Sequence, residues 1–314
     1  MSNDETLFDS LARAVSRPSS RRAALAAILA GAMMSMTLGN AGADDNDRAK
    51  KRRKRKRRRD DPMAPQPPMA AACDVCEQGC AHADLRAAIN AASAGATIRL
   101  CAGEYKPGPA ISINKELTLA GAGAGATILK GSGQVRSMEI GPAGVVTLRD
   151  LTITGGKELQ KPRLGGAGII VWDRGRLTME RCLVHGNNAH EGGGITVNKG
   201  SSLTLIETAI EQNTAFTIGG GLLVRRGGTA TITARSRISE NYVRVLGAGI
   251  FAEEEAVVTL ESGCEVTENT GGEMGGGIVS SRATVTLADT SIVTGNHPDN
   301  CGGMVGSPIV NCVG

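Results

Sequence analysis

Two glutamates hold the same place in neighbouring copies of a repeated phrase, and their type and spacing suit acid–base chemistry. Glu240 directly precedes Asn241, and Glu268 directly precedes Asn269. If successive repeats stack like neighbouring strands, the two carboxylates lie about 5 Å apart. Like charges at that distance raise a carboxyl pKa or bind a cation such as calcium. The alternative is that both are solvated glutamates at a bend of the chain.

Six of the eight cysteines gather near the two ends of region 73–314. Cys301 and Cys312 stand apart from the others, which predicts a disulfide between them if the chain is exported. The remaining four are Cys73, Cys76, Cys80 and Cys101. Four cysteines allow three pairings, and the sequence does not choose among them. Alternatively, Cys73, Cys76 and Cys80 bind zinc together with His82, because their short spacing suits zinc ligands.

These candidates belong to a repeat that determines how the chain must fold. A glycine cluster ends in an aliphatic residue five times, at steps of 26, 27, 28 and 28 residues. An asparagine keeps the same period, at steps of 26, 28, 28 and 27. The aliphatic residues are Ile169, Ile195, Leu222, Ile250 and Ile278, and the asparagines are Asn187, Asn213, Asn241, Asn269 and Asn296. A period of this length is typical of stacked repeats.

Each repeat consists of short alternating runs without the spacing of a long amphipathic helix. A Leu-Thr-Leu-like run such as Leu203–Leu205 follows the glycine cluster, and an aliphatic residue such as Ile210 precedes the asparagine by three positions. Short β-branched runs of this kind predict strands. Three strands in about 27 residues predict an all-β, single-stranded parallel β-helix, in which each coil buries its apolar side against the next.

Residues at equal offsets then stack in columns about 4.8 Å apart. The asparagines predict an amide ladder that begins at Asn187 and binds backbone groups coil after coil. A charged column alternates in sign, as cross-strand pairing favours, and contains Asp150, Arg181, Glu207 and Arg235.

Two further cysteines, Cys182 and Cys264, share one column three coils apart. Their separation of about 14 Å exceeds the span of a disulfide. They are therefore expected to be free and buried.

One apolar column lies beside the inward aliphatic residues. If Ile195 and its counterparts point inward, the residues that follow them point outward. These residues are Ile170, Thr196, Leu223, Phe251 and Val279, and Trp172 lies two positions beyond Ile170 on the same face. The stripe predicts either a partner-binding surface or a surface that a loop or the N-terminal tail covers.

The phrases Gly-Gly-Gly-Ile, Leu-Thr-Leu and Ile-x-x-Asn resemble the right-handed parallel β-helix repeats of the pectin-lyase-like superfamily, especially its exported bacterial repeat proteins. Leu85–Leu100 resembles the start of that family, a short N-terminal capping helix followed by the first coil. The resemblance implies a right-handed coil over about residues 83–300. It does not imply one activity, because lyases, hydrolases, epimerases, adhesins and inert scaffolds share this coil.

The first 43 residues are typical of an export signal. Arg21 and Arg22 precede the apolar run 23–38, which is followed by Ala-Gly-Ala at 41–43. This order predicts a signal peptide, and the paired arginines resemble a twin-arginine signal. A retained membrane anchor is the alternative. The chain is thus expected to be secreted or envelope-associated, with a signal peptide at 1–43, a linker at 44–72 and a β-helix domain at 73–314.

The linker carries the basic character of the chain. Residues 48–59 contain eleven basic residues in twelve, whereas region 73–314 holds 20 Lys/Arg and 23 Asp/Glu, a net charge of −3. Such a segment cannot bury a core, which predicts a disordered spacer. It either stays solvated or attaches the chain to an anionic cell-wall polymer or lipid surface. No nucleic acid is expected, because no aromatic residues interleave with the basic ones.

These observations favour an exported β-helix protein with a surface-binding, adhesive or structural role at the cell envelope, without catalysis or cofactor. The expected partner is a cell-wall polymer, a polysaccharide or another envelope protein. The alternative is a polysaccharide lyase or glycoside hydrolase that acts on an acidic polysaccharide through Glu240 and Glu268. His190 and Glu191 lie beyond a bend without a partner that the sequence can place, so they are expected on the exposed surface.

Overall fold

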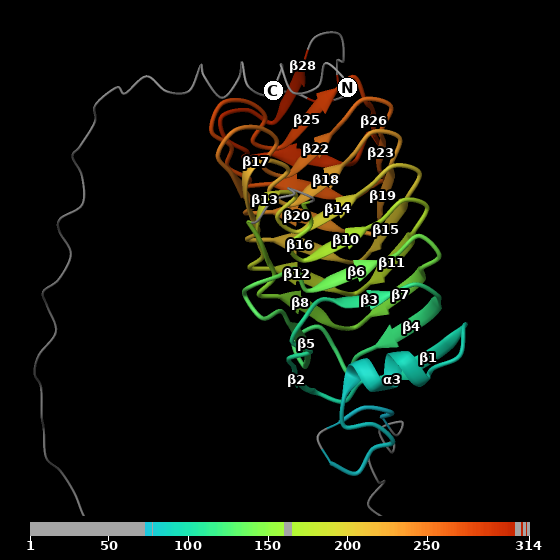
Figure 1. The fold of residues 1–314 in the computed structure, drawn as a ribbon. Helices are drawn as coiled ribbons and strands as arrows, with labels where there is room; N and C mark the ends of the chain where they lie inside the picture. Colours follow the sequence, from blue (N-terminus) through green and yellow to red (C-terminus); the bar gives the residue numbers. More distant parts are fainter. Residues whose placement is uncertain (1–72, 77, 160–164, 305–308, 310–311, 313–314) are drawn as a thin grey trace, which may run out of the picture. The chain divides into compact units, whose positions relative to one another are not determined.

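The computed structural model describes residues 73–76, 78–159, 165–304, 309 and 312. In this part the chain winds into a parallel β-helix, whose strands form three eight-stranded sheets along one stack of coils (Figure 1). The predicted all-β parallel coil is confirmed, and paired residues such as Leu203 and Ala230 lie 27 positions apart. The predicted signal peptide 1–43 and linker 44–72 lie outside the described residues.

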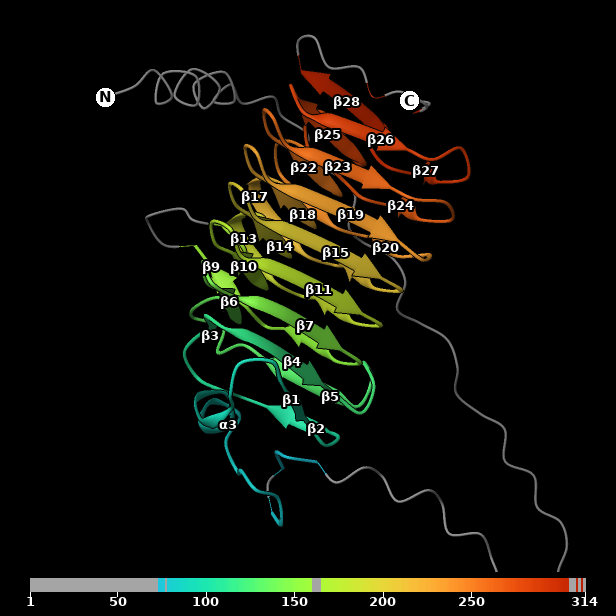
Figure 2. The same ribbon diagram turned by 90° about the vertical axis from the view of Figure 1, so that its right-hand side faces the viewer.

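Sheet 1 contains the Leu-Thr-Leu-like runs, and Figure 2 shows it facing the viewer. Each strand pairs in register with its counterpart one coil away, as Leu177 does with Leu203. The strands are β1 (Ala96–Arg99), β4 (Glu116–Ala120), β7 (Val145–Arg149), β11 (Arg176–Glu180), β15 (Ser202–Ile206), β19 (Thr229–Thr233), β23 (Val257–Leu260) and β26 (Thr284–Leu287).

Sheets 2 and 3 complete each coil. Sheet 2 follows the glycine cluster and consists of β3 (Ile111–Ile113), β6 (Met138–Ile140), β10 (Ile169–Val171), β14 (Ile195–Val197), β18 (Leu222–Val224), β22 (Ile250–Ala252), β25 (Ile278–Ser281) and β28 (Cys301–Met304). Sheet 3 leads to the asparagine and consists of β2 (Gly103–Tyr105), β5 (Thr127–Lys130), β8 (Thr152–Thr154), β12 (Leu183–His185), β16 (Ala209–Glu211), β20 (Arg237–Ser239), β24 (Glu265–Thr267) and β27 (Ile292–Thr294).

A fourth, shorter sheet departs from the predicted three strands per coil. Sheet 4 follows the asparagine and consists of β9 (Lys157–Glu158), β13 (Asn188–Glu191), β17 (Thr214–Ile218) and β21 (Tyr242–Val243). Its register shifts between Ala189 and Glu191. This sheet lengthens the path from sheet 3 back to sheet 2 in the middle coils.

The apolar column on the outer side of sheet 2 is buried, so the prediction of an exposed partner surface there is wrong. Ile170, Leu223 and Val279 are fully buried, and Phe251 is 5% exposed. Ile218 at the end of β17 and Leu246 beyond β21 pack against this column as a second small core. The alternative prediction, a covering loop, is the one the structure shows. Trp172 is only partly buried.

The main core runs through the coils because the inward residue of each strand stacks on its equivalent. Ile195, Leu222 and Ile250 are fully buried in successive strands of sheet 2. Leucine and isoleucine fill most of the inner positions of sheet 1, among them Leu205 and Ile232. Burial along the whole stack explains how a fold of such short strands is held together.

The N-terminal end of the stack carries the predicted short capping helix, α3 (Leu85–Ala91). The Asp84 carboxylate accepts hydrogen bonds from the backbone N–H groups of Arg86 and Ala87, which is N-cap geometry. Leu85, Ala88 and Ile89 are buried, so the helix closes the open end of the core. No described helix has the length and apolar character needed to cross a bilayer.

The asparagines form a continuous ladder. The side-chain oxygen of Asn213 accepts from the backbone N–H of Asn187 at 3.1 Å and from its Nδ2 at 2.9 Å. The same pair of bonds links Asn213 to Asn241, Asn241 to Asn269, and Asn269 to Asn296. At the N-terminal end Asn187 accepts from Gly156, and at the other end Asn300 accepts from Asn296.

Candidate functional site

An unbroken column of threonines runs along the outer side of sheet 1, the sheet whose strands face the viewer in Figure 2. In each strand the residues before and after the threonine point into the core, as Leu203 and Leu205 do beside Thr204. The paired threonines are Thr97, Thr118, Thr147, Thr178, Thr204, Thr231, Thr259 and Thr286. All eight are half-exposed or exposed.

The two halves of this column differ in their flanking charges. In the N-terminal half, charged side chains such as Arg149, Arg176 and Glu180 flank the threonines. From β15 to β26 the flanking strand positions are uncharged. We call this surface the threonine face, and it comprises Ser202, Thr204, Ile206, Thr229, Thr231, Thr233, Val257, Thr259, Thr284 and Thr286. Glu261, beyond β23, lies at its edge and accepts a hydrogen bond from Thr233.

The threonine face combines hydroxyl groups with methyl groups on a rigid support. Neighbouring strands lie about 4.8 Å apart, so equivalent side chains repeat at that interval. The χ1 angle of threonine is restricted, because its Cβ is branched. These side chains therefore lose little rotamer entropy when a ligand binds. Such a surface suits a ligand that itself repeats hydroxyl and CH groups.

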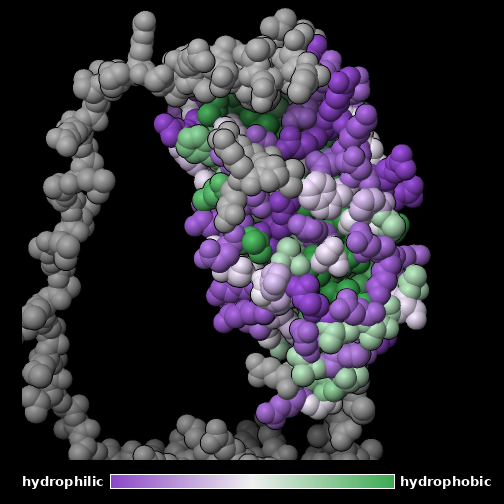
Figure 3. All heavy atoms as spheres, in the orientation of Figure 1, coloured by the Kyte–Doolittle hydropathy of each residue, from purple (hydrophilic) through white to green (hydrophobic). Residues whose placement is uncertain are grey.

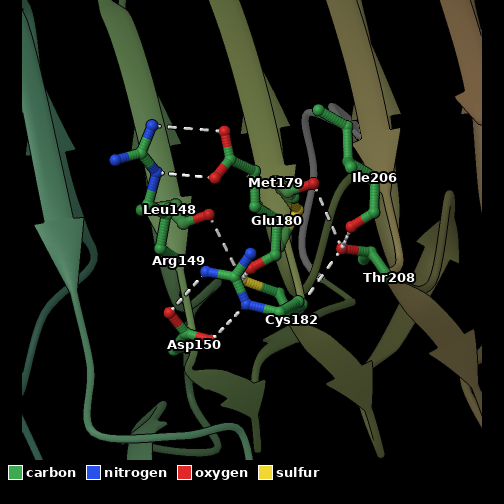
Figure 4. Close-up of polar contacts among 9 residues, drawn as sticks. Leu148, Arg149, Asp150, Met179, Glu180, Cys182, Ile206 and Thr208 are labelled. Carbon is green, nitrogen blue, oxygen red and sulfur yellow. Dashed lines mark hydrogen bonds and ion pairs between the residues drawn. The ribbon is translucent and has the colours of Figure 1, made fainter. Parts of the chain in front are cut away.

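Carboxylates where sheet 1 leads into sheet 3 are paired with arginines of a neighbouring coil. Figure 4 shows Arg149 facing Glu180, with Nε 2.7 Å from Oε2. Asp150 accepts two hydrogen bonds from Arg181, at 2.7 and 2.8 Å. The weaker contact of Arg235 with Glu207, at 4.0 Å, extends the alternating column. These groups bind one another and stabilise the stacking of coils.

A second charged group lies where sheet 4 meets sheet 2. The Arg225 guanidinium is 2.7 Å from Glu191 Oε2 and 3.3 Å from Glu253 Oε1. His190 Nδ1 is 3.9 Å from Glu191 Oε1 and 3.4 Å from the Thr217 hydroxyl. The His190 side chain is 12% exposed and packs on Phe216. The expectation that His190 and Glu191 are exposed surface residues is therefore wrong.

Among the described residues, the most buried ion pair belongs to the preceding coils on the same side. The Arg136 guanidinium contacts Glu158 at 2.8 Å and Glu139 at 3.3 Å, and it lies over the Trp172 ring. Its side chain is 6% exposed. Figure 3 shows this side of the molecule as mainly hydrophilic, with small apolar patches between polar side chains.

Glu240 and Glu268 occupy a column of left-handed backbone. Their φ values are 54° and 57°, and glycines hold the equivalent place at Gly186 and Gly295. Both side chains are exposed, and the Glu240 carboxylate accepts a hydrogen bond from Gln212 at 2.8 Å. Neither belongs to a described group of three or more potential metal ligands.

Disulfides close both ends of the described fold. The pairs are Cys73 with Cys101, Cys76 with Cys80, and Cys301 with Cys312. This resolves the pairing that the sequence left open, and in this state the sulfurs of Cys73, Cys76 and Cys80 are not thiolate ligands. Cys182 and Cys264 are free and buried.

Two features of this site were missed from the sequence. The threonine column has a clear sequence signal, the central residue of every Leu-Thr-Leu-like run, which was interpreted only as a strand. The ion pair of Glu191 with Arg225 has no sequence signal. Arg225 lies 34 residues away and meets Glu191 only because of the path of sheet 4.

Comparison with known proteins identifies the fold. A family model described as a right-handed β-helix region matches residues 118–302. A solved structure of an alginate lyase from Paenibacillus sp. strain FPU-7 aligns with 70% of this chain and 95% of its own, at 15% identity and a TM-score of 0.32. Similarity at this level carries no argument about activity. No curated protein matches the chain.

Proposed function

Because this chain belongs to the right-handed β-helix family, we propose that it is an exported, non-catalytic protein that binds a polysaccharide of the cell envelope through the threonine face. The observation that carries this proposal is the uncharged, half-exposed array of hydroxyl and methyl groups from β15 to β26. Its regular spacing matches a polymer that repeats the same groups.

The ligand is an uncharged polysaccharide, because the strand positions of the threonine face are uncharged and the charge at its edge, the Glu261 carboxylate beside Thr233, would repel an anionic polymer. Region 73–314 is itself slightly acidic, with 20 Lys/Arg against 23 Asp/Glu. An anionic polymer would gain no electrostatic attraction from this region. The basic run 48–59 is the segment suited to an anionic surface.

Charge pairing in the coils supports a role without catalysis. The carboxylates of Glu191 and Glu253 share Arg225, and those of Glu139 and Glu158 share Arg136. Other carboxylates are paired along the stack, namely Asp150, Glu180, Glu211, Glu254 and Glu255. These pairs join neighbouring coils and give the carboxylates a structural role.

The test is co-sedimentation of the purified chain with insoluble uncharged polysaccharides, with cellulose and chitin as probes. The Thr204→Lys/Thr231→Lys variant places two charges on the threonine face and should reduce the bound fraction by roughly ten-fold or more. Thr147→Lys/Thr178→Lys is the matched control, because it changes the same column in the charged half. Equal loss in both variants, or no binding by the unmodified chain, would contradict the proposal.

A second candidate function, lysis or hydrolysis of an acidic polysaccharide, is favoured by one observation. His190, Glu191 and Arg225 bring together a titratable imidazole, a carboxylate and a cation with limited solvent exposure. Such groups can move a proton and neutralise a developing charge.

Product release from pectate and alginate, measured with and without calcium, decides between the two functions. We expect no turnover. Turnover that is abolished by His190→Gln would assign catalysis to this group, whereas loss in Glu240→Gln would assign it to the exposed glutamates. Either result would replace the non-catalytic proposal.

A further inference from the structure

The four cysteines of the N-terminal cap lie in one compact group. The Cys73–Cys101 and Cys76–Cys80 disulfides are neighbours, and the Sγ atoms of Cys76, Cys80 and Cys101 all lie within 4.8 Å of one another. The Sγ atom of Cys73 is bonded to that of Cys101. Two disulfides could close this end of the fold without being neighbours, so their closeness is not explained by crosslinking alone.

We propose that the reduced cap binds one zinc ion through Cys73, Cys76, Cys80 and Cys101, and that oxidation to the two disulfides releases it. Tetrahedral zinc binds thiolate sulfur at about 2.3 Å, which places the sulfurs about 3.8 Å apart. The Cys101 sulfur lies within 4.8 Å of the sulfurs of Cys76 and Cys80, so the two disulfides together already bring the four sulfurs into one group. Breaking the two S–S bonds lets each pair separate to the distance that zinc requires.

The backbone holds these cysteines together without the disulfides. The Tyr105 hydroxyl donates to the carbonyl oxygens of Val75 and Cys101, each at 3.0 Å. The Cys101 N–H donates to Val75, and the Cys76 N–H donates to His82. These bonds fix both segments that carry the cysteines, so reduction leaves the ligands near one another.

The ligand set differs from the one that the sequence indicated. His82 was the expected fourth ligand, but it does not join the group of sulfurs, and its backbone pairs with Asp74 and Cys76. Cys101 follows β1 and takes that place. A site of four thiolates is one of the closed arrangements that bind structural zinc, with no open position for catalysis.

The two states are related by a balanced exchange. Four thiolates on Zn²⁺ become two disulfides and lose four electrons. Two molecules of a disulfide oxidant accept these electrons, take up four protons and leave as dithiols, while Zn²⁺ is released. The zinc form therefore belongs to a reducing compartment and the disulfide form to an oxidising one. Zinc binding itself does not depend on the proposed polysaccharide function.

Cobalt(II) is a suitable probe, because tetrathiolate coordination gives it characteristic absorption bands. The full chain, reduced and kept without oxygen, should bind one cobalt ion and then exchange it for zinc. Diamide should release the metal and lower the chain mass by four hydrogens at the cap. Polysaccharide binding is not part of this measurement, so its failure would leave this result unaffected.

Variants identify the ligands. Cys101→Ser and Cys80→Ser should each weaken cobalt binding by roughly ten-fold or more, whereas His82→Ala and Cys264→Ser should bind as the parent does. Far-UV circular dichroism verifies that each variant keeps its β structure. A reduced chain with four free cap thiols that binds no cobalt, or equal binding by Cys101→Ser, would overturn the proposal.

Discussion

At the residue scale, Cys182 shows how burial controls chemistry in this coil. Its Sγ atom lies 3.3 Å from the carbonyl oxygens of Leu148 and Glu180 (Figure 4). Burial raises the pKa of the Cys182 thiol to about 12, from an ordinary value of 9.0. The thiol is therefore neutral at physiological pH and is a poor nucleophile.

The raised pKa predicts a loss of stability at high pH. Above pH 9 the unfolded chain loses the Cys182 proton while the folded chain keeps it, so the free energy of unfolding should fall between pH 9 and about 12. Urea unfolding at several pH values measures this slope. Cys182→Ser should reduce this slope, because a serine hydroxyl does not titrate in this range. The column accepts serine, since Ser236 already occupies the equivalent place two coils further on. An unchanged slope in the variant would show that Cys182 does not carry it.

At the scale of elements, the asparagine ladder joins the turns of successive coils. The Asn241 side chain accepts two hydrogen bonds from Asn213 and donates to the Ile210 carbonyl oxygen at 2.9 Å. It is 1% exposed, so water cannot replace these partners. The ladder therefore fixes the register of each coil on the next.

Removal of a buried side-chain amide from the ladder should lower the free energy of unfolding more than removal of an exposed side-chain amide. Asn241→Ala leaves the buried backbone N–H of Asn213 without its acceptor, whereas Asn213 Nδ2 keeps the carbonyl oxygens of Val184 and Glu211. The unsatisfied N–H should lower the free energy of unfolding by about 2 kcal/mol. Asn188→Ala, at an exposed position of β13, is the control and should change it by less than about 0.5 kcal/mol. Urea unfolding measures both, and hydrogen exchange of the Asn213 amide should quicken only in Asn241→Ala. Similar effects in the two variants would contradict a ladder role.

At the scale of the whole molecule, charge is unevenly distributed along the chain. Region 73–314 carries a net charge of −3, whereas segment 48–59 carries eleven positive charges. A segment of that composition attracts an anionic surface by about 1 kcal/mol per basic residue close to it. The proposed attachment of the chain to an anionic surface is thus separable from the proposed binding of a polymer by the folded coils.

Replacing the eleven basic residues of 48–59 with serine should abolish co-sedimentation with phosphatidylglycerol vesicles. The unmodified chain should lose its binding as salt rises, because screening shortens the range of the attraction. Neutral phosphatidylcholine vesicles are the control and should bind neither form. Binding that survives the serine replacement would show that this segment does not attach the chain.

Much of the fold could be predicted because each contact in the stack joins residues at equal offsets. The asparagine period placed Asn187 to Asn296 in one column, and the hydrogen bonds follow that column. Alternation around Leu203 identified the core of sheet 1. The exposed place of Glu240 was likewise foreseen as a solvated bend.

The charged group around Arg225 and the covered side of sheet 2 were harder to predict, because their contacts join residues that do not hold equal offsets in the repeat. The chain from the end of sheet 4 to sheet 2 covers the outer side of sheet 2 through Ile218 and Leu246. Leu223 and Phe251 are therefore buried although the alternation of the strand points them outward. The same detour brings Arg225 to Glu191 and buries His190.

The sequence by itself determined the coil, its columns and its stacking ladder, because a repeat of about 27 residues places equivalent side chains one strand apart. Only the tertiary structure decided the cysteine pairs, the burial of the outer side of sheet 2 and the limits of the threonine face. Those features depend on how turns and side strands run between coils, and neither period nor alternation encodes that path.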